Sequence, residues 1–137
     1  MPLPVRDRDV EVVIVKSLRA IQGQRRVLVD GKLQPFYDAQ IIYKSARKWY
    51  FRNGTNLNDD VFIKSGLERL PDEYIEGVPD DWFRRGNVLV EVTDRDPTAR
   101  SPEPGLRFNY YHGSMAAQGY RVRIYRCLLG TFAWYTL

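Results

Sequence analysis

The sequence predicts a mainly β fold, either a small β-barrel or sandwich or an α+β sheet. Short segments rich in β-branched and aromatic residues recur along the 137 residues, with turn-forming residues between them. Asp30-Gly31 separates two such segments and is typical of a two-residue hairpin turn, in which glycine tolerates a positive φ. The length favours one domain over residues 1–137, and the sequence shows no heptad pattern or internal repeat.

The first half of the chain is expected to form strands. The β-branched run DVEVVIVK, residues 9–16, is suited to a buried strand. The hairpin around Asp30-Gly31 follows, and residues 37–43 and 48–53 predict a second strand pair. VFIKS, residues 61–65, predicts one more short strand.

The middle of the chain predicts one or two short helical turns. Pro71 and Pro79 are each followed by two acidic residues. Proline fits a helix start because its missing N–H would have no helical partner there, and acidic residues favour the positive end of the helix dipole. Gly77 and Gly86 are expected to end these turns, and VLVEVTD from Val88 returns to strand alternation.

The last part of the chain predicts a long loop and three strands. Residues 94–105 hold three prolines and no apolar periodicity, which predicts a proline-rich loop. Strands are expected at 106–111, 120–129 and 131–137. Within YRVRIYR, apolar residues alternate with arginines, so we expect one buried face and one arginine-bearing face. The predicted buried side comprises Tyr120, Val122 and Ile124, and the other side carries Arg121 and Arg123.

Charged residues are unevenly distributed along this basic protein, whose net charge is +4. Residues 1–52 hold 11 Lys and Arg against 5 Asp and Glu, residues 53–103 hold 6 against 12, and residues 104–137 hold 4 against none. This basic, acidic, basic order predicts surfaces of opposite sign. Such surfaces would favour docking to a complementary protein or to another copy of the chain.

The composition favours an intracellular, soluble protein or a component of a viral particle. The single cysteine, Cys127, excludes an intrachain disulfide. Charged residues occur within the first nine residues before any apolar run, which is not expected of a signal peptide. The longest uncharged segment, 127–137, is too short for a membrane helix. We expect no membrane association, cofactor or metal. One histidine and one cysteine are too few for a zinc site, and the glycine motifs that bind phosphates are absent.

The sequence favours a non-enzymatic role. YHGS, residues 111–114, resembles the opening motif of the ADP-ribosyltransferases, a family that also requires a downstream catalytic glutamate. No aspartate or glutamate follows His112, so the resemblance does not extend to that residue. A small metal-independent ribonuclease is a third interpretation, with His112 as the base and Arg121 or Arg123 as the phosphate-binding group.

A nucleic-acid-binding β-module is the alternative hypothesis. Segments 44–52 and 120–126 interleave cations with aromatic residues, as base stacking combined with phosphate contacts requires. Strand alternation produces the same pattern when the aromatic side chains form the core and the cations face water. The candidate residues are Lys44, Arg47, Lys48, Trp49, Arg52, Arg121, Arg123 and Tyr125.

The favoured hypothesis is a structural or assembly subunit of a larger oligomeric complex. It is based on the segregated charge, on the extended proline-rich loop at 94–105 and on the uncharged, aromatic C-terminal strand, which suits a subunit interface. Small β-barrel subunits with extended loops are common in viral and phage rings and connectors, so we expect a complex of that type. We expect a protein partner or self-association, with Phe132, Trp134 and Tyr135 as interface candidates.

Overall fold

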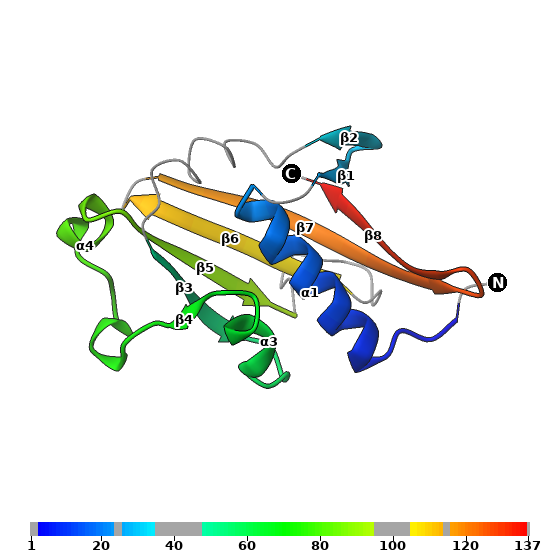
Figure 1. Ribbon diagram of the computed structural model, residues 1–137, viewed down its shortest axis with the longest axis horizontal. Helices are drawn as coiled ribbons and strands as arrows, with labels where there is room; N and C mark the ends of the chain where they lie inside the picture. Colours follow the sequence, from blue (N-terminus) through cyan, green and yellow to red (C-terminus); the bar gives the residue numbers. More distant parts are fainter. Residues whose placement is uncertain (1–2, 24–25, 35–47, 95–104, 114–115, 137) are drawn as a thin grey trace.

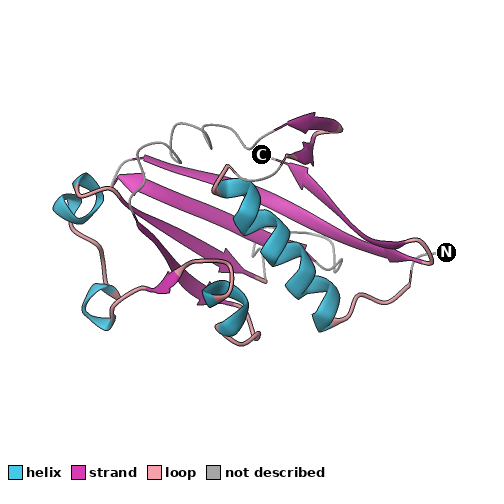
Figure 2. Cartoon of the chain, viewed as in Figure 1, coloured by secondary structure: helices cyan, strands magenta, loops and turns pink. Residues whose placement is uncertain are grey.

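A single mixed β-sheet with one long helix across it forms the framework of the protein (Figures 1 and 2). The computed structural model describes residues 3–23, 26–34, 48–94, 105–113 and 116–136, with the side chains of 116–118 excepted. The strands are β1 (Val27–Val29), β2 (Lys32–Gln34), β3 (Lys48–Gly54), β4 (Glu68–Arg69), β5 (Asn87–Thr93), β6 (Gly105–Gly113), β7 (Ala116–Cys127) and β8 (Gly130–Thr136). The helices are α1 (Asp7–Ile21), α3 (Asp60–Ile63), the 3₁₀ turn η1 (Asp72–Tyr74) and α4 (Asp80–Arg84).

The strands follow the order β2-β1-β8-β7-β6-β5-β3-β4 across the sheet. The central strands, from β8 to β5, pair antiparallel, whereas β3 pairs parallel with both β5 and β4, and β1 pairs parallel with β8. The predicted mainly β class is confirmed. Among the described residues the sheet ends at β2 and at β4, and no pairing joins these two edges to close a barrel.

The main core lies between α1 and one face of the sheet. Alternate residues of the central strands point to this face, as the period of a β-strand requires. Phe108 and Tyr120 pair across β6 and β7, Val122 and Tyr135 pair across β7 and β8, and all four side chains are buried. The predicted split of YRVRIYR is confirmed, because Tyr120, Val122 and Ile124 are buried whereas Arg121 and Arg123 are exposed.

The strand predicted at residues 9–16 is wrong, because this segment lies within helix α1. Its buried residues recur with helical spacing, as Val13, Ser17, Ala20 and Ile21 show. A short β-branched run fits either structure when judged alone. Here the packing of one apolar stripe against the sheet outweighs the modest preference of valine and isoleucine for strands.

The short strand predicted at residues 61–65 is also wrong, because α3 spans Asp60–Ile63. Phe62 of this helix is fully buried, and its ring stacks on Phe51 of β3 at a centroid distance of 4.7 Å. A four-residue segment carries too few positions for periodicity to distinguish a helix from a strand.

The predicted turns in the first and middle parts of the chain are confirmed. Asp30 and Gly31 connect β1 to β2 with φ angles of 50° and 83°, the left-handed region that this hairpin turn needs. The turns after Pro71 and Pro79 are η1 and α4, and each proline immediately precedes its helical residues. Residues 35–47 and 95–104 lie outside the described part of the chain. The strand predicted at 37–43 and most of the predicted loop at 94–105 therefore fall there.

A second apolar cluster covers part of the opposite face of the sheet. Trp82 and Phe83 of α4 pack with Leu70 and Leu89, and Tyr50 and Tyr111 border this cluster. The cluster occupies the end of the sheet at β3 and β5. Among the described residues it does not extend over β7 and β8, whose arginine and large aromatic side chains at Arg121, Arg123, Tyr125, Phe132 and Trp134 are exposed on this face.

A buried hydrogen bond joins α1 to the C-terminal strand. The Ser17 hydroxyl donates to the Val13 carbonyl at 2.7 Å, so Tyr135 is the donor in the 2.8 Å bond between the Tyr135 and Ser17 hydroxyls. Both side chains are fully buried. This bond fixes β8 beneath the middle of the helix.

We predict that Tyr135→Phe lowers the free energy of unfolding by about 1 kcal/mol, because it deletes one buried hydrogen bond while keeping the ring. Urea unfolding followed by circular dichroism measures the change. Tyr125→Phe is the matched control, since Tyr125 is 42% exposed and its substitution should change stability by less than about 0.5 kcal/mol. Equal losses in the two variants would contradict the prediction.

Candidate interaction surface

The sheet face opposite α1 carries a cluster of exposed cationic and aromatic side chains. We call it the open face; its exposed members are Arg121, Arg123, Tyr125, Phe132 and Trp134, and it also includes Arg107, which is half-buried. The three aromatic side chains are 42%, 51% and 43% exposed in chain order, which is unusual for large apolar groups on the central strands of a sheet. Exposed apolar groups that lie together mark interaction sites more often than scattered ones do.

Strand register brings the members of the open face together. Arg107 pairs with Arg121 across β6 and β7, Arg123 pairs with Trp134 across β7 and β8, and Tyr125 pairs with Phe132. Side chains at directly opposed positions lie about 5 Å apart at Cβ and share one face. The open face is therefore a continuous strip along β7.

Gly119, which has no side chain, leaves room for Asn109 and Arg107 at the end of the open face near Arg121. A Cβ atom at this position would lie 2.5 Å from the Asn109 Oδ1 atom and 3.3 Å from an Arg107 guanidinium nitrogen. The first distance is shorter than any real Cβ contact, so a side chain would displace Asn109. Glycine thus allows the side chains of β6 to lie close to the sheet beside Arg121.

The turn between β7 and β8 is strongly apolar. Leu128 and Leu129 form the two-residue connection between the paired residues Cys127 and Gly130, and they are 94% and 89% exposed. Hairpin turns of this length normally use glycine, asparagine or aspartate. In Figure 1 this turn lies at the end of the molecule opposite α4. We call the β7–β8 hairpin from Tyr125 to Trp134 the arm.

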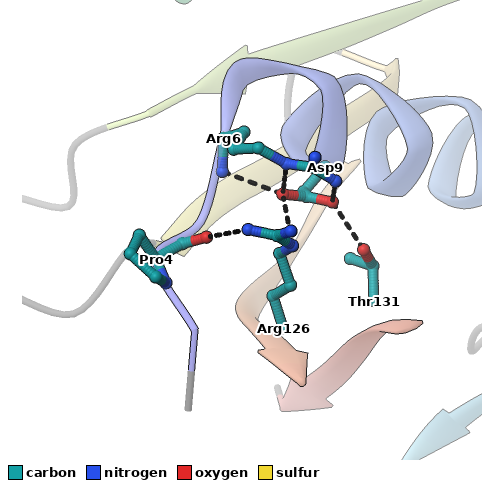
Figure 3. A network of polar contacts seen from close by, with 5 residues as sticks. All are labelled: Pro4, Arg6, Asp9, Arg126 and Thr131. Atoms are coloured by element: carbon teal, nitrogen blue, oxygen red, sulfur yellow. Dashed lines mark hydrogen bonds and ion pairs between the residues drawn. The ribbon is translucent and has the colours of Figure 1, made fainter. Parts of the chain in front are cut away.

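A buried carboxylate ties the arm to the N-terminus of α1 (Figure 3). Asp9 accepts hydrogen bonds from the Arg6 backbone N–H at 2.9 Å, from Arg6 Nε at 3.1 Å and from the Thr131 hydroxyl at 2.6 Å. Its side chain is 4% exposed. Arg126 reaches towards the same carboxylate, with Nε 3.9 Å from Oδ2, and donates to the Pro4 carbonyl at 3.1 Å.

These contacts favour the ionised form of Asp9. The hydrogen bonds from Arg6 and Thr131 hold the pKa of the Asp9 carboxyl well below its ordinary value, and they outweigh the opposing effect of burial. A depressed pKa in the folded state means that ionised Asp9 stabilises the fold above the unfolded pKa of about 4. That contribution is lost progressively as the pH falls below this value.

We predict that Asp9→Asn destabilises the protein at pH 7, because asparagine cannot pair with Arg6 as an anion. The difference in urea midpoint between the two proteins should be constant above about pH 5 and should shrink as the pH falls below about 4. Unfolding series from pH 7 to pH 2 measure it. A difference that is independent of pH over this range would show that the charge of Asp9 does not matter.

Ion pairs neutralise part of the acidic middle block. Arg52 contacts Glu91 at 2.8 Å on the open-face side of the sheet, Lys48 contacts Glu68 at 3.0 Å, and Arg69 contacts Asp59. Burial raises the pKa of Tyr111, and the neighbouring Glu91 charge, whose Oε1 atom lies 3.4 Å from the tyrosine hydroxyl, raises it further. The acids of residues 72–81 form no comparable pairs among the described residues, apart from a 3.8 Å contact between Asp81 and Arg84.

The structure gathers some of the predicted nucleic-acid-binding residues and separates others. Arg121, Arg123 and Tyr125 lie together on the open face. Lys48 and Arg52 lie farther along the same side of the sheet, each in an ion pair. Lys44 and Arg47 fall outside the described residues.

Two predicted surface aromatics require correction. Trp49 is 9% exposed and Tyr135 is fully buried, and both belong to the core beneath α1. Successive residues of a strand point to opposite faces of the sheet. The neighbours of Trp49 and Tyr135 point to the open face, so these two side chains point to the face that α1 covers. They are unavailable for stacking or docking in this fold, whereas the other two interface candidates, Phe132 and Trp134, are exposed.

The residues of the ribonuclease interpretation are not brought together. His112 is exposed on β6, five residues along the strand from Arg107, the residue that pairs with Arg121. Five residues of a strand span about 16 Å. Arg123 lies farther still, since its partner Gly105 begins β6. A base and a phosphate clamp must reach one phosphodiester, so this arrangement offers no shared reaction centre.

Sequence reasoning missed Arg107 and the leucine turn. In LRFNYY, Arg107 alternates with the apolar residues Leu106 and Phe108, as Arg121 alternates with its neighbours in YRVRIYR. This alternation could have identified Arg107 as a residue of the open face. Leu128 and Leu129 stand immediately before Gly130, a residue type common in turns, but their exposure depends on the register that pairs Cys127 with Gly130. That register depends on contacts between the two strands.

Comparisons with protein-family models, with curated proteins and with solved structures find no match. Within the described ranges, no three histidine, cysteine, aspartate or glutamate side chains form a group able to hold a metal ion. A search of the same residues finds no helix with the length and apolar character needed to cross a membrane.

Proposed function

We propose that the protein is a non-enzymatic assembly subunit that associates with copies of itself into a larger complex. The single observation that carries this proposal is the exposed apolar surface of the arm. Burying a leucine side chain completely contributes about 1.5 to 3 kcal/mol, and Leu128 and Leu129 remain almost entirely exposed in the isolated chain. Phe132 and Trp134 add aromatic surface of the kind that anchors interfaces.

The arm is also positioned for docking. The Asp9 contacts hold Thr131 and Arg126, the residue pair next to the one that closes the turn, against the start of α1, and the turn lies at an end of the molecule. A preorganised element loses less conformational freedom on binding than a flexible one, so more of the contact energy remains as affinity. We propose a ring or connector component of a viral or phage particle as the type of subunit.

We predict that the wild-type protein forms oligomers at micromolar concentration and that Leu128→Ser combined with Leu129→Ser shifts it towards the monomer. Light scattering coupled to size exclusion measures the mass. The matched control is Leu33→Ser, because Leu33 is also exposed, at 64%, but lies on β2. A wild-type protein that stays monomeric at high micromolar concentration would refute the proposed function.

Nucleic-acid binding is the second candidate, and a specific observation favours it. Register places Arg107 opposite Arg121, with Arg123 two residues further along β7, and the exposed rings of Tyr125, Phe132 and Trp134 lie beside them. Guanidinium groups that contact phosphates, next to rings that stack on bases, form the surface that single strands bind.

For this candidate we predict that Arg121→Ala combined with Arg123→Ala weakens binding of a single-stranded oligonucleotide. The slope of log affinity against log salt should fall by about 1 to 2, because two phosphate contacts are lost. Fluorescence anisotropy over a salt series measures both quantities. Arg84→Ala with Arg85→Ala removes the same charge from the C-terminal end of α4 and its C-cap and serves as the control. Unchanged binding in the β7 variant would exclude the open face.

A further inference from the structure

The outer surface of α1 contains a basic hollow. It has a volume of about 690 Å³ and is bordered by residues of α1, by Lys64 immediately after α3 and by Thr131 and Ala133 of β8. Arg8, Lys16, Arg19 and Lys64 line it, against the single acid Glu11. Val12, which is 53% exposed, and Val15 supply apolar surface between these charges. We call this hollow the helix groove.

An acidic projection lies elsewhere on the molecule. Between the end of β4 and the end of α4, Asp72, Glu73, Glu76, Asp80 and Asp81 are all exposed, and only Arg84 and Arg85 oppose them. Ile75 stands among these acids and is 66% exposed. We call residues 72–81 the acidic lobe. Tyr74 and Val78 of the lobe pack on the cluster around Trp82, which holds it against the sheet.

The helix groove and the acidic lobe match in two independent respects. Their charges are opposite, with four cations and one acid in the groove against five acids in the lobe. Each also has apolar side chains among its charged ones, namely Val12 and Val15 in the groove and Ile75 in the lobe. An apolar core surrounded by a charged or polar rim is the ordinary plan of a protein interface.

The two surfaces do not meet within one chain. The η1–α4 region lies at one end of the sheet, and α1 crosses the sheet nearer its other end (Figure 1). None of the described ion pairs joins a residue of the lobe to a residue of the groove. One copy can therefore present its lobe to the groove of another copy while its own groove stays open.

We propose that copies of this chain associate head to tail, with the acidic lobe of one copy seated in the helix groove of the next. This inference rests on the proposed assembly function and names the partner and the contact. Because the two halves of the contact are different surfaces, the association is heterologous, and its repetition produces a ring or a filament. The arm then supplies further surface between neighbouring copies.

Charge reversal on each surface tests the contact. The lobe variant carries Glu73→Lys and Glu76→Lys, which flank Ile75, and the groove variant carries Arg8→Glu and Arg19→Glu. Each variant alone should associate at least about tenfold more weakly than the wild type, because like charges then face each other. Association of the wild type should weaken as salt rises from about 0.05 to 0.5 M, because the charges are screened. Sedimentation velocity over a concentration series measures these effects.

Mixing the two variants provides the decisive measurement. In the mixture, the unchanged acidic lobe of the groove variant can enter the unchanged basic groove of the lobe variant, so association should return. The chain that carries all four reversals should also associate with itself. The control variant, Arg26→Glu with Lys32→Glu, alters net charge as the groove variant does but lies outside both surfaces, and it should behave as the wild type.

The possible failures separate the two proposals. Oligomers that persist in both charge variants but disappear in the leucine-turn variant would overturn the lobe-to-groove contact and leave the assembly function standing. A wild-type protein that is monomeric throughout would overturn both. Loss of oligonucleotide binding in the groove variant, with its mass unchanged, would assign the groove to a nucleic acid and would also refute the contact.

Circular dichroism verifies that each variant is folded. The lobe variant changes exposed residues that take part in no described ion pair, so it remains usable if the groove variant unfolds.

Discussion

The packing of α1 against one face of the sheet is the constraint on which the rest of the structure depends. Its buried stripe and the inward residues of the central strands form one core, and the Ser17–Tyr135 hydrogen bond satisfies polar groups at the centre of it. Once the helix occupies this face, the residues that alternate with the core must point to the other face. The open face is thus a direct consequence of where the helix lies.

The second apolar cluster makes the open face asymmetric. Trp82 and Phe83 cover the end of the sheet at β3 and β5, where Leu89 is buried on that side. Along β7 and β8 the same face carries arginines and exposed rings. A chain that gained only stability from this sheet would be expected to cover Phe132 and Trp134 or to replace them with polar residues. The proposed self-association would bury these two side chains.

Charge is arranged at two scales in this protein. Near the sheet, residues of the basic first block and of the acidic middle block are interleaved, so that pairs such as Arg52 and Glu91 neutralise each other. Away from the sheet, the acids of residues 72–81 project from η1 and α4, and the cations of α1 surround a hollow on the opposite face. Exposed pairs of the first kind contribute little to stability. Separated charges produce a directional field, and the proposed contact between copies would use this field.

The sequence by itself determined the β-rich class, the Asp30-Gly31 hairpin, the turns after Pro71 and Pro79, and the two-faced character of β7, because each depends on alternation or on the φ preference of a local residue. Alternation also identified Arg121 and Arg123 as surface residues, whereas Tyr125 was chosen because aromatic residues and cations interleave, and Phe132 and Trp134 were chosen with Tyr135 because the C-terminal strand is uncharged and aromatic. Only the tertiary structure decided that residues 7–21 are helical, that Trp49 and Tyr135 are buried, and that the leucine turn is exposed. Each of these depends on contacts between segments far apart in the chain: the modest strand preference of a β-branched run is outweighed when a sheet packs against one of its helical stripes. The helix groove likewise became visible only when folding placed Lys64 and Ala133 beside α1.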